Sequence, residues 1–538
     1  MSDIVPSRPT PPPGDAAPAP QAVPVPASRA AIAGVVSAVA ALAVGELVAA
    51  VVPGVPSPVA AVGAAVIDLA PPGTKEVVVG LLGTNDKPAL QLLVTGIVLL
   101  AGAGIGLLAR GGIVRAAVAV AVLVGAGALA TLRDPTAATG PVIVGAALAA
   151  GVGLAVLLVL LGWARPPAAA ATDPVVASAT RRRFLVGAGA VGVLAALGGL
   201  VGRSLGDSRA ETTASSAAAN VAIPDAVDPA PSLAPDNTLD VAGITPLVVP
   251  NGEFYRIDTA LVTPAVDLDT WRLRVHGMVE REVTLTFDQL VELPLIERYV
   301  TIACVSNEVG GRLIGNAKWT GVLLTDVLEM AGVLPGATQI VPRSVDGWTA
   351  GFPTTWVTGP DGPRDALIAV KMNDETLPAA HGFPARLIVP GLFGYVSATK
   401  WLGELELTTL EAFDAYWVPR GWAKEAPILT QSRIDVPRDG ASVPAGTVQV
   451  AGVAWAPDRG VSGVEVQVDD GAWQPAILAT PIGPQTWVQW RFAWEATPGT
   501  HNLTVRATDG TGEVQTAEAT SPAPDGARGH HAILVRVS

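Results

Sequence analysis

Five apolar stretches of about 20 residues each lie within the first two hundred positions, and they constrain the architecture of the chain more than any other feature. The stretches cover residues 30–52, 89–109, 113–132, 141–162 and 184–202. About 20 apolar residues in a helix cross the ~30 Å hydrocarbon core of a bilayer, and five such stretches in succession are rare in soluble proteins. We therefore expect five transmembrane helices within residues 29–202. The apolar segment Val59–Ala70 is too short to span and is expected at the outer membrane surface.

Basic residues predict the orientation of these spans, because cytoplasmic loops carry an excess of Lys and Arg. With the N-terminus inside, the cytoplasmic segments hold eight arginines: Arg8, Arg29, Arg110, Arg115, Arg165 and Arg181–Arg183. The outer loops hold only Lys75, Lys87 and Arg133, each beside an acidic residue. The Pro/Ala-rich residues 1–28 are then a disordered cytoplasmic tail. An odd number of spans places everything after Gly202 outside the cytoplasm, in a multi-pass protein of the cell membrane.

The last span opens on Thr180-Arg181-Arg182-Arg183-Phe184-Leu185, which resembles a twin-arginine export signal. That pathway carries folded cargo, so the signal would suit a downstream domain that folds around a cofactor in the cytoplasm. The three arginines would also serve as simple positive-inside anchors. Both interpretations stay open.

Charged and metal-binding residue types exclude several function classes. The net charge of −13 argues against a nucleic-acid partner, which needs clustered Lys and Arg. All five histidines follow residue 270, so the membrane part cannot hold a bis-histidine haem. Glu46, inside the first span, is either a proton or quinone contact or a polar residue satisfied within the bundle.

The composition and the hydrophobic pattern of the chain change after the last span. Residues 203–240 are rich in Ala, Ser, Asp and Pro and are interpreted as a tether outside the cytoplasm. Four later segments predict strands and helices: Trp271–His276 as a strand, Thr284–Leu293 as a strand that runs into a helix capped at Thr286, Val300–Ala303 as a strand, and Leu323–Ala331 as a helix. They interleave without a βαβ rhythm, which favours an α+β domain over residues 241–425.

From about Pro427 onward the pattern is that of short alternating strands. The runs are Thr447–Trp455, Val464–Val468, Trp487–Trp494 and Leu503–Ala507, with Gly, Asp and Pro between them. This pattern is typical of an immunoglobulin-like β-sandwich, which we expect over residues 426–538. The late motif Gly526–His531 either faces the preceding domain or forms a surface loop.

The single cysteine, Cys304, excludes an intrachain disulfide and any all-protein site with two or four cysteines. It ends an apolar strand and precedes a Gly-rich loop, a placement that suits a thiolate presented at the mouth of a pocket. The alternative for a lone cysteine is a small buried hydrophobe.

Several separated motifs surround this cysteine in a fixed order. They are Phe254-Tyr255-Arg256, His276-Gly277, Thr286–Leu290, Cys304 with Asn307, Trp319-Thr320-Gly321, Asp346-Gly347-Trp348, Ala369–Glu375, His381-Gly382-Phe383-Pro384-Ala385-Arg386 and Lys400-Trp401. Together they resemble the sulfite oxidase family of molybdopterin enzymes between Asn251 and Thr409. The multi-domain fold that we expect is therefore a set of transmembrane α-helices, an α+β molybdopterin domain of the sulfite oxidase kind, and an immunoglobulin-like domain.

The resemblance implies a role for each matching residue. Cys304 would bind molybdenum as a thiolate, beside the sulfurs of the pterin dithiolene, and Trp348 would stand at the metal. Donors to the phosphate and pterin of molybdopterin would be Tyr255, Arg256, His381, Arg386, Ser397 and Lys400, and Asp346 would accept from the pterin amino groups. The alternative for each is an ordinary surface ion pair or hydrogen bond.

The function implied is two-electron redox chemistry on a small-molecule substrate, with electrons exchanged with an external carrier, either a cytochrome or quinone. One alternative is a quinone-linked reductase of sulfoxide-like substrates, and another is a metal-free membrane-tethered binding or sensing module. The C-terminal domain often mediates dimers in this family, so a homodimer is also implied.

Three departures from the sulfite-oxidising pattern argue against sulfite as the principal substrate. In that pattern an arginine stands five residues after the cysteine, where this chain has Val309. A tyrosine is expected at the metal, where this chain has Trp348. A cation expected just before Lys400-Trp401 is absent from residues 395–399. A site for a small oxyanion needs fixed cations near the metal, so these changes favour a neutral or larger substrate.

Overall fold

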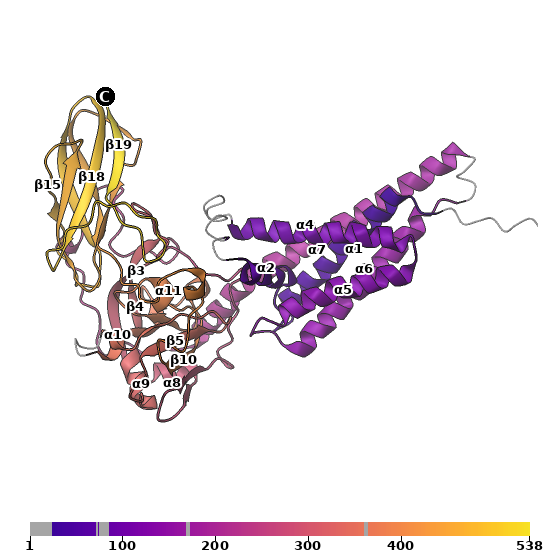
Figure 1. The fold of residues 1–538 in the computed structure, drawn as a ribbon, viewed down its shortest axis with the longest axis horizontal. Coiled ribbons are helices and arrows are strands. Elements are labelled where there is room, and N and C mark those ends of the chain that lie inside the picture. Colours follow the sequence, from indigo (N-terminus) through magenta and orange to yellow (C-terminus); the bar gives the residue numbers. More distant parts are fainter. Residues whose placement is uncertain (1–23, 72–73, 75–85, 168–172, 360–363) are drawn as a thin grey trace, which may run out of the picture. The chain divides into compact units, whose positions relative to one another are not determined.

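The computed structural model describes residues 24–71, 74, 86–167, 173–359 and 364–538 (Figure 1). These residues form two compact units. The first comprises Met1–Val59, Leu90–Thr131 and Ala138–Arg203, and the second comprises Ala60–Ala89, Leu132–Ala137 and Ser204–Ser538. Most of the predicted tail, up to residue 23, lies outside the described residues.

Long apolar helices make up the first unit, as the sequence predicts. The helices of this half of the chain are α1 (Ala27–Val51), α2 (Pro58–Leu69), α4 (Asp86–Ala109), α5 (Ile113–Thr131), α6 (Thr139–Ala164) and α7 (Pro174–Asn220). All except α2 are long and apolar enough to cross a membrane. Many of their large apolar side chains, such as Leu92 and Leu100, are exposed to the surroundings of the chain. This distribution suggests membrane association for the unit.

Small residues let α1 and α4 approach each other closely. A β-carbon at Gly106 would lie 1.9 Å from the carbonyl oxygen of Ala30, and one at Gly34 would lie 2.0 Å from the carbonyl oxygen of Gly102. Glycine at these positions is therefore required by contact between the two backbones. Close packing through small residues is the usual way in which helices associate in a lipid environment.

Glu46, the acidic residue of the first span, is buried and hydrogen-bonded. Its Oε1 accepts hydrogen bonds from Ser57 Oγ at 2.9 Å and from the backbone N–H of Val59 at 3.3 Å. The carboxylate thus caps the N-terminus of α2, where helical N–H groups lack partners. Of the two interpretations offered by the sequence, this geometry favours the satisfied polar residue.

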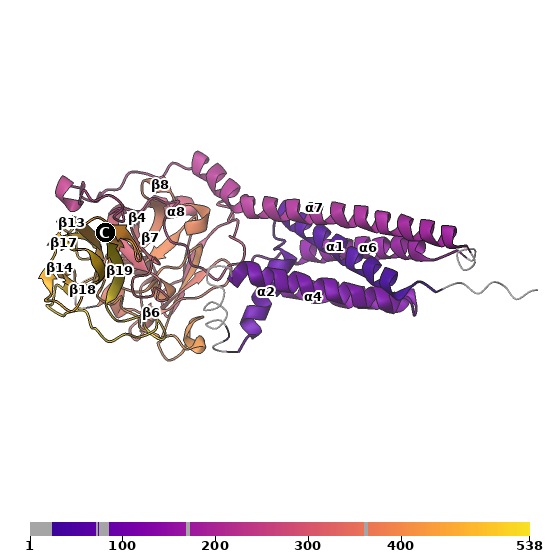
Figure 2. The ribbon, with the colours of Figure 1, turned by 90° about the horizontal axis from the view of Figure 1, so that it is seen from above.

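Helix α7 extends well beyond the predicted span (Figure 2). It continues to Asn220, so the first half of the predicted tether, residues 203–240, is helical rather than irregular. Its last part is rich in alanine, a strong helix former. Ala210 and Ala214 are buried there against Ala379 and Phe383, which supplies the packing that an isolated Ala-rich segment would lack.

Two sheets form the domain that follows, one mixed and one antiparallel. One has the strand order β2 (Val283–Leu285), β1 (Leu273–Gly277), β10 (Leu402–Thr408), β5 (Gln339–Ser344) and β6 (Phe352–Pro353). The other has the order β3 (Leu295–Ala303), β4 (Ile314–Leu323), β7 (Leu367–Met372) and β8 (Glu375–Thr376), with β9 (Arg386–Ile388) also paired to β7. Strands β1 and β10 pair in parallel, whereas β3 and β4 form an antiparallel hairpin.

Short helices lie between these strands and on either side of them in the chain. They are α8 (Phe287–Val291), α9 (Leu324–Ala331), α10 (Thr355–Thr358) and α11 (Gly394–Ser397), with 3-10 turns η3 (Pro235–Asn237), η4 (Ala379–His381) and η5 (Val418–Arg420). Thr286 caps α8 as predicted, since its Oγ1 accepts from Gln289 N at 3.2 Å while Gln289 Oε1 accepts from Thr286 N at 2.9 Å. The predicted α+β class is confirmed.

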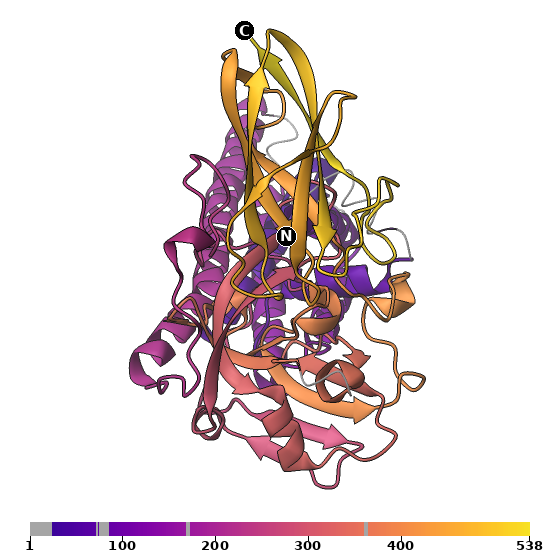
Figure 3. The ribbon, with the colours of Figure 1, turned by 90° about the vertical axis from the view of Figure 1, so that its left-hand side faces the viewer.

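The C-terminal domain is a sandwich of two sheets, orange to yellow in Figure 3. One sheet contains β11 (Gln431–Val436), β13 (Gly446–Trp455), β17 (Val488–Ala496) and β16 (Ile477–Leu478). The other contains β12 (Ser442–Val443), β19 (His531–Val537), β18 (Gly499–Asp509), β14 (Val461–Val468) and β15 (Gln474–Pro475). The predicted immunoglobulin-like architecture is confirmed.

The α+β domain and the sandwich share one hydrophobic core. Trp455 and Trp487 of the sandwich are fully buried within the core cluster of the α+β domain. Trp487 also donates its backbone N–H to Thr301 Oγ1 and its Nε1–H to the carbonyl of Leu247, both at 2.8 Å. A shared core of this kind disfavours independent movement of the two domains.

Candidate functional site

Cys304 stands at the turn of the β3–β4 hairpin. Its backbone N–H donates to the carbonyl of Leu313 at 2.8 Å, directly after the last strand pair Ala303–Ile314. Residues 304–313, which we call the cysteine loop, connect the two strands. The side chain of Cys304 is buried. A rigid hairpin therefore fixes the backbone from which the thiol projects, as the sequence predicted for a strand end.

Asn307 stabilises the cysteine loop from within. Its backbone N–H donates to the carbonyl of Cys304 at 3.0 Å, and its Oδ1 accepts from Leu313 N at 2.7 Å. A β-carbon at Gly311 would lie 2.6 Å from Asn307 Oδ1. The loop thus needs an amide side chain at residue 307 and no side chain at residue 311.

Arg386, the first residue of β9, is a buried cation with few partners. Its Nη1 donates to the carbonyl of His381 at 3.2 Å, and its guanidinium lies 5.3 Å from the centre of the Trp319 ring. Its Nε is buried and has no hydrogen-bond partner among the residues that the structure describes. Burial lowers the pKa of Arg386 to about 10, although the nearby Tyr255 and Asp258 act in the opposite direction. Such a cation is costly to bury unless an anion binds it.

A second buried cation, Lys400, lies beside Asp258. The two groups are 2.9 Å apart, and the ammonium also donates to the carbonyl of Ala380 at 3.0 Å. Burial lowers the pKa of Lys400 to about 8, against the attraction of Asp258. Lys400 therefore belongs to a polar site beside the 3-10 turn η4, which contains Ala380.

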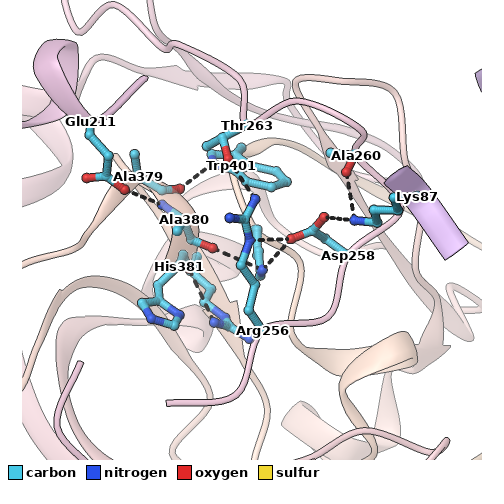
Figure 4. Close-up of polar contacts among 12 residues, drawn as sticks. Lys87, Glu211, Arg256, Asp258, Ala260, Thr263, Ala379, Ala380, His381 and Trp401 are labelled. Carbon is cyan, nitrogen blue, oxygen red and sulfur yellow. Dashed lines mark hydrogen bonds and ion pairs between the residues drawn. The ribbon is translucent and has the colours of Figure 1, made fainter. Parts of the chain in front are cut away.

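Asp258 is the shared partner of three cations. Lys87, in the first turn of α4, and Arg256 form ion pairs with it at 2.8 and 3.1 Å. Figure 4 draws these contacts. Burial alone would raise the pKa of Asp258, but the neighbouring Lys400, Lys87 and Arg256 hold it far below its usual range. We call Lys87, Arg256, Arg386 and Lys400, gathered around this carboxylate, the cation cluster. The positive charges of this cluster outnumber the one negative charge of Asp258, so the cluster can bind a further anion.

His381 lies near the cation cluster, and only one of its two ring nitrogens forms a hydrogen bond among the described residues. Its Nε2 lies 2.9 Å from the carbonyl oxygen of Asn251, which assigns the proton to Nε2, because a carbonyl can only accept. Burial and the nearby Arg386 lower the pKa of His381 to about 4. The ring is therefore neutral at pH 7. Its buried Nδ1 has no partner within the described part of the chain and can accept a hydrogen bond from a ligand.

Tyr255 links the cation cluster to the cysteine. Burial and the proximity of Cys304 raise the pKa of its hydroxyl well above the ordinary value, while Arg386 acts in the opposite direction. The hydroxyl therefore stays protonated and can donate. Trp348, in the turn after β5, also has a buried Nε1–H, for which the described residues offer no partner.

The remaining predicted residues take mainly local bonds. Asp346 accepts from Trp348 N at 3.1 Å, and burial raises its pKa. Ser397 Oγ donates to the carbonyls of Leu392 and Phe393 at 3.0 Å. The Arg256 side chain is 45% exposed and also donates to Thr263 Oγ1 at 2.7 Å. These bonds account for the local positions of the three side chains.

The structure thus brings Cys304, Tyr255, His381, Arg386 and Lys400 into one site. Sequence reasoning missed Asp258 and Lys87. Asp258 stands two positions after Arg256 and could have been suspected from that spacing, whereas Lys87 is distant in sequence and carried no signal. Among the described residues, no group of three His, Cys, Asp or Glu side chains could hold a metal ion by itself. The site can therefore bind a polyvalent anionic, hydrogen-bonding group next to one thiol.

Comparisons with known proteins agree with this description. Residues 260–417 match the family described as "Oxidoreductase molybdopterin binding domain", and residues 431–505 match "Bacterial Ig domain". Mitochondrial sulfite oxidase of Homo sapiens is 29% identical over 322 residues, which cover 52% of this chain and 57% of that protein. Nitrate reductase [NADH] of Volvox carteri is 31% identical over 178 residues, covering 28% of this chain and 20% of that protein.

Among solved structures, the sulfane dehydrogenase SoxCD from Paracoccus pantotrophus aligns with a TM-score of 0.48 and 22% identity, covering 56% of this chain and 83% of that one. The chain spans little more than half the length of the human sulfite oxidase that it matches.

Proposed function

We propose that this chain, which belongs through its central domain to the sulfite oxidase family of molybdopterin oxidoreductases, is a membrane-anchored enzyme that carries out two-electron redox chemistry at a molybdenum centre ligated by Cys304. The observation that carries the proposal is the buried and incompletely paired guanidinium of Arg386. It lies in the same site as buried Lys400 and as Cys304, the single thiol of the chain. An anionic cofactor that is bound there would compensate these charges.

The residues present fit molybdopterin, which has a phosphate and a pterin with both donors and acceptors. Arg386 and Lys400 would hold the phosphate through charge-assisted hydrogen bonds. Nδ1 of His381 would accept from a pterin N–H group, and the Trp348 indole would donate. When bound, the cofactor supplies a metal that exchanges two electrons with a substrate. Each of these roles rests on a polar atom that has no partner within the described residues or on a buried charge.

Cys304 would contribute a soft thiolate, the ligand type that suits molybdenum in such centres. The rigid hairpin and the bonds of Asn307 would keep the sulfur in place during turnover. Tyr255, held protonated by its surroundings, would donate to an oxygen of the cofactor or substrate near the metal. The geometry of the loop therefore supports a ligand that is positioned before the metal binds.

For the anchor, we propose five membrane spans with a cytoplasmic N-terminus and a catalytic domain outside the cytoplasm. Five apolar helices support the spans, and the arginine distribution supports the orientation. Arg181–Arg183 lie within α7, in the first turns of its apolar part. They would act as a twin-arginine signal that exports the folded, cofactor-loaded domain.

For the reaction, we propose a small-molecule substrate and an external carrier, a cytochrome or a quinone, that exchanges electrons with the site. Arg312, the cation nearest in sequence to Val309, is an exposed residue. This placement supports a substrate that is neutral or larger than sulfite. A homodimer formed through the C-terminal domain is part of the proposal.

Analysis of molybdenum and pterin in the purified chain, combined with a dye-linked substrate screen in both directions, tests this function. We expect both components at equimolar amounts and dye-dependent turnover of at least one substrate. A folded chain that contains neither component, even when expressed in cells that make the cofactor, would instead identify a metal-free binding or sensing module. Turnover in the reducing direction alone would favour the sulfoxide-type reductase.

A further inference from the structure

His531, the first residue of β19 in the C-terminal domain, packs against the cysteine loop. Gly310 of the loop has a φ of +77°, and a β-carbon at this position would lie 2.2 Å from Cδ2 of His531. The imidazole ring therefore occupies the space that a side chain would take. Two segments separated by more than two hundred residues are thus in direct contact, six residues after Cys304.

The His531 ring is itself fixed by the sandwich. Its Nδ1 accepts a hydrogen bond from the backbone N–H of Ile434 in β11 at 3.0 Å. This bond requires Nδ1 to be unprotonated. Burial and the nearby Arg433 lower the pKa of His531, whereas Asp435 and Asp439 act in the opposite direction. The neutral ring is thus held between β11 and the loop.

A second contact from the same domain holds the next residue of the loop. Arg433 Nη1 donates to the carbonyl of Gly311 at 2.7 Å. The other nitrogens of this buried guanidinium bind Asp435 Oδ1 at 2.7 Å and Thr245 Oγ1 at 2.9 Å. Asp435 Oδ2 in turn accepts from Thr245 N at 3.0 Å. Because each guanidinium nitrogen of Arg433 has a partner and the side chain is only 5% exposed, its bond to Gly311 is geometrically restrained.

We propose that His531 and Arg433 are positioning residues that hold the cysteine loop closed and thereby set the orientation of the Cys304 thiol. The inference rests on the proposed function of Cys304 and goes beyond it, because it assigns a part of the active site to the immunoglobulin-like domain. Neither residue touches the reacting atoms. They act through Gly310 and Gly311, whose missing side chains allow the close approach.

His531 and Arg433 could also serve only to join the two domains. This alternative predicts a different result when the two side chains are removed. If the two residues only join the domains, their removal should weaken the fold as a whole. If they position the loop, removal should loosen residues 304–313 selectively while the shared core around Trp455 and Trp487 stays protected. Local opening and global unfolding are separable by amide hydrogen exchange.

The test uses the full-length chain in detergent without cofactor, so that it does not depend on metal loading. Hydrogen exchange of the peptide covering residues 304–313 and the alkylation rate of Cys304 are measured for His531→Ala and Arg433→Gln. We expect both rates to rise on the order of tenfold, the size of a local opening made about 1.4 kcal/mol easier. His530→Ala is the matched control, because His530 packs on Trp473 at 5.4 Å and its ring pairs with the Gln515 carbonyl instead.

Two further substitutions separate the contacts of His531. His531→Asn keeps an acceptor for Ile434 N–H but lacks the part of the ring that covers Gly310, so the loop should still open. His531→Phe keeps the ring and loses the acceptor, so it should restore much of the protection. Wild-type exchange and alkylation rates in His531→Ala and Arg433→Gln, or rates no different from those of His530→Ala, would overturn the proposal. A chain that proves to bind no molybdenum would refute the proposed function without changing these rates.

Discussion

The ammonium group of Lys400 lies 2.9 Å from a carboxylate oxygen of Asp258, and both side chains are buried. This pair alone would be neutral. Lys87 and Arg256 share the same carboxylate, and Arg386 lies near it, so the site as a whole keeps an excess of positive charge. The charge pattern is thus that of a site which is completed by an anion.

Lys400 should make the stability of the cofactor-free protein depend on pH. Burial lowers the pKa of Lys400 to about 8 in the fold, from an ordinary value of 10.5. Between these two values the unfolded chain binds more protons than the folded chain, so stability should rise as the pH increases from 8 to 10.5. Melting temperatures of the cofactor-free chain across this range provide the measurement.

Two controls belong to that experiment. Lys400→Met should remove this part of the rise, and bound cofactor should suppress it, because an anion keeps Lys400 protonated. A pH profile that is identical in wild type and Lys400→Met would contradict the assignment of the buried, titrating group.

Replacing Arg386 should separate cofactor binding from folding. Arg386→Met removes a buried and incompletely paired charge, so the cofactor-free variant should be at least as stable as the wild type, with a gain of about 1 kcal/mol or more. Its molybdenum content should fall at least about tenfold, since a charge-assisted pair contributes roughly 1.5–3 kcal/mol. Thermal melting and metal analysis of the same preparations measure both effects. A variant that retains full molybdenum would show that Arg386 does not bind the cofactor.

The arginines at the start of the apolar part of α7 provide a prediction about export. Substituting lysine at Arg181, Arg182 and Arg183 keeps the charge but removes the twin-arginine motif. We expect the catalytic domain of this variant to stay in the cytoplasm, where protease added to intact cells cannot reach it. Protease digestion of cells, followed by detection of the C-terminal domain, distinguishes the outcomes. Normal export of the lysine variant would leave these arginines as positive-inside anchors only.

Sulfite should be a poor substrate. Val309, Trp348 and the uncharged residues 395–399 leave fewer fixed cations for a small oxyanion than the sulfite-oxidising pattern has, which would lower its binding. Steady-state assays with sulfite and an artificial electron acceptor measure the effect. Efficient, saturable turnover at micromolar sulfite would refute this prediction, and the Val309→Arg variant should raise any residual sulfite activity.

Local sequence patterns were sufficient to predict the apolar helices, the Thr286 cap and the strand that ends at Cys304, because each depends on neighbouring residues. The helical continuation of α7 to Asn220 was missed, since its Ala-rich composition suits both a tether and a helix, and contact of Ala210 and Ala214 with Phe383 decides between them. At the site, too, contacts between residues distant in sequence decide what the local sequence pattern leaves open.

Tertiary contacts account for what the sequence left open at the site. Lys87 reaches Asp258 from a position 171 residues earlier in the chain, and no motif marks Lys87. The motif that ends at His531 left two interpretations, a surface loop or a face toward the preceding domain. The contact with Gly310 favours the second for His531, and only the folded chain brings these residues together.

The proposed activity depends most directly on a bond between Cys304 and molybdenum. X-ray absorption at the molybdenum edge, recorded for the wild type and for Cys304→Ser, counts the sulfur atoms bound to the metal. The serine variant should keep its fold and part of its cofactor, because Arg386 and Lys400 are unchanged, while its turnover vanishes. We predict one sulfur neighbour fewer at molybdenum in the variant than in the wild type. An unchanged sulfur count, or wild-type turnover by Cys304→Ser, would contradict the assignment of Cys304 as the molybdenum ligand.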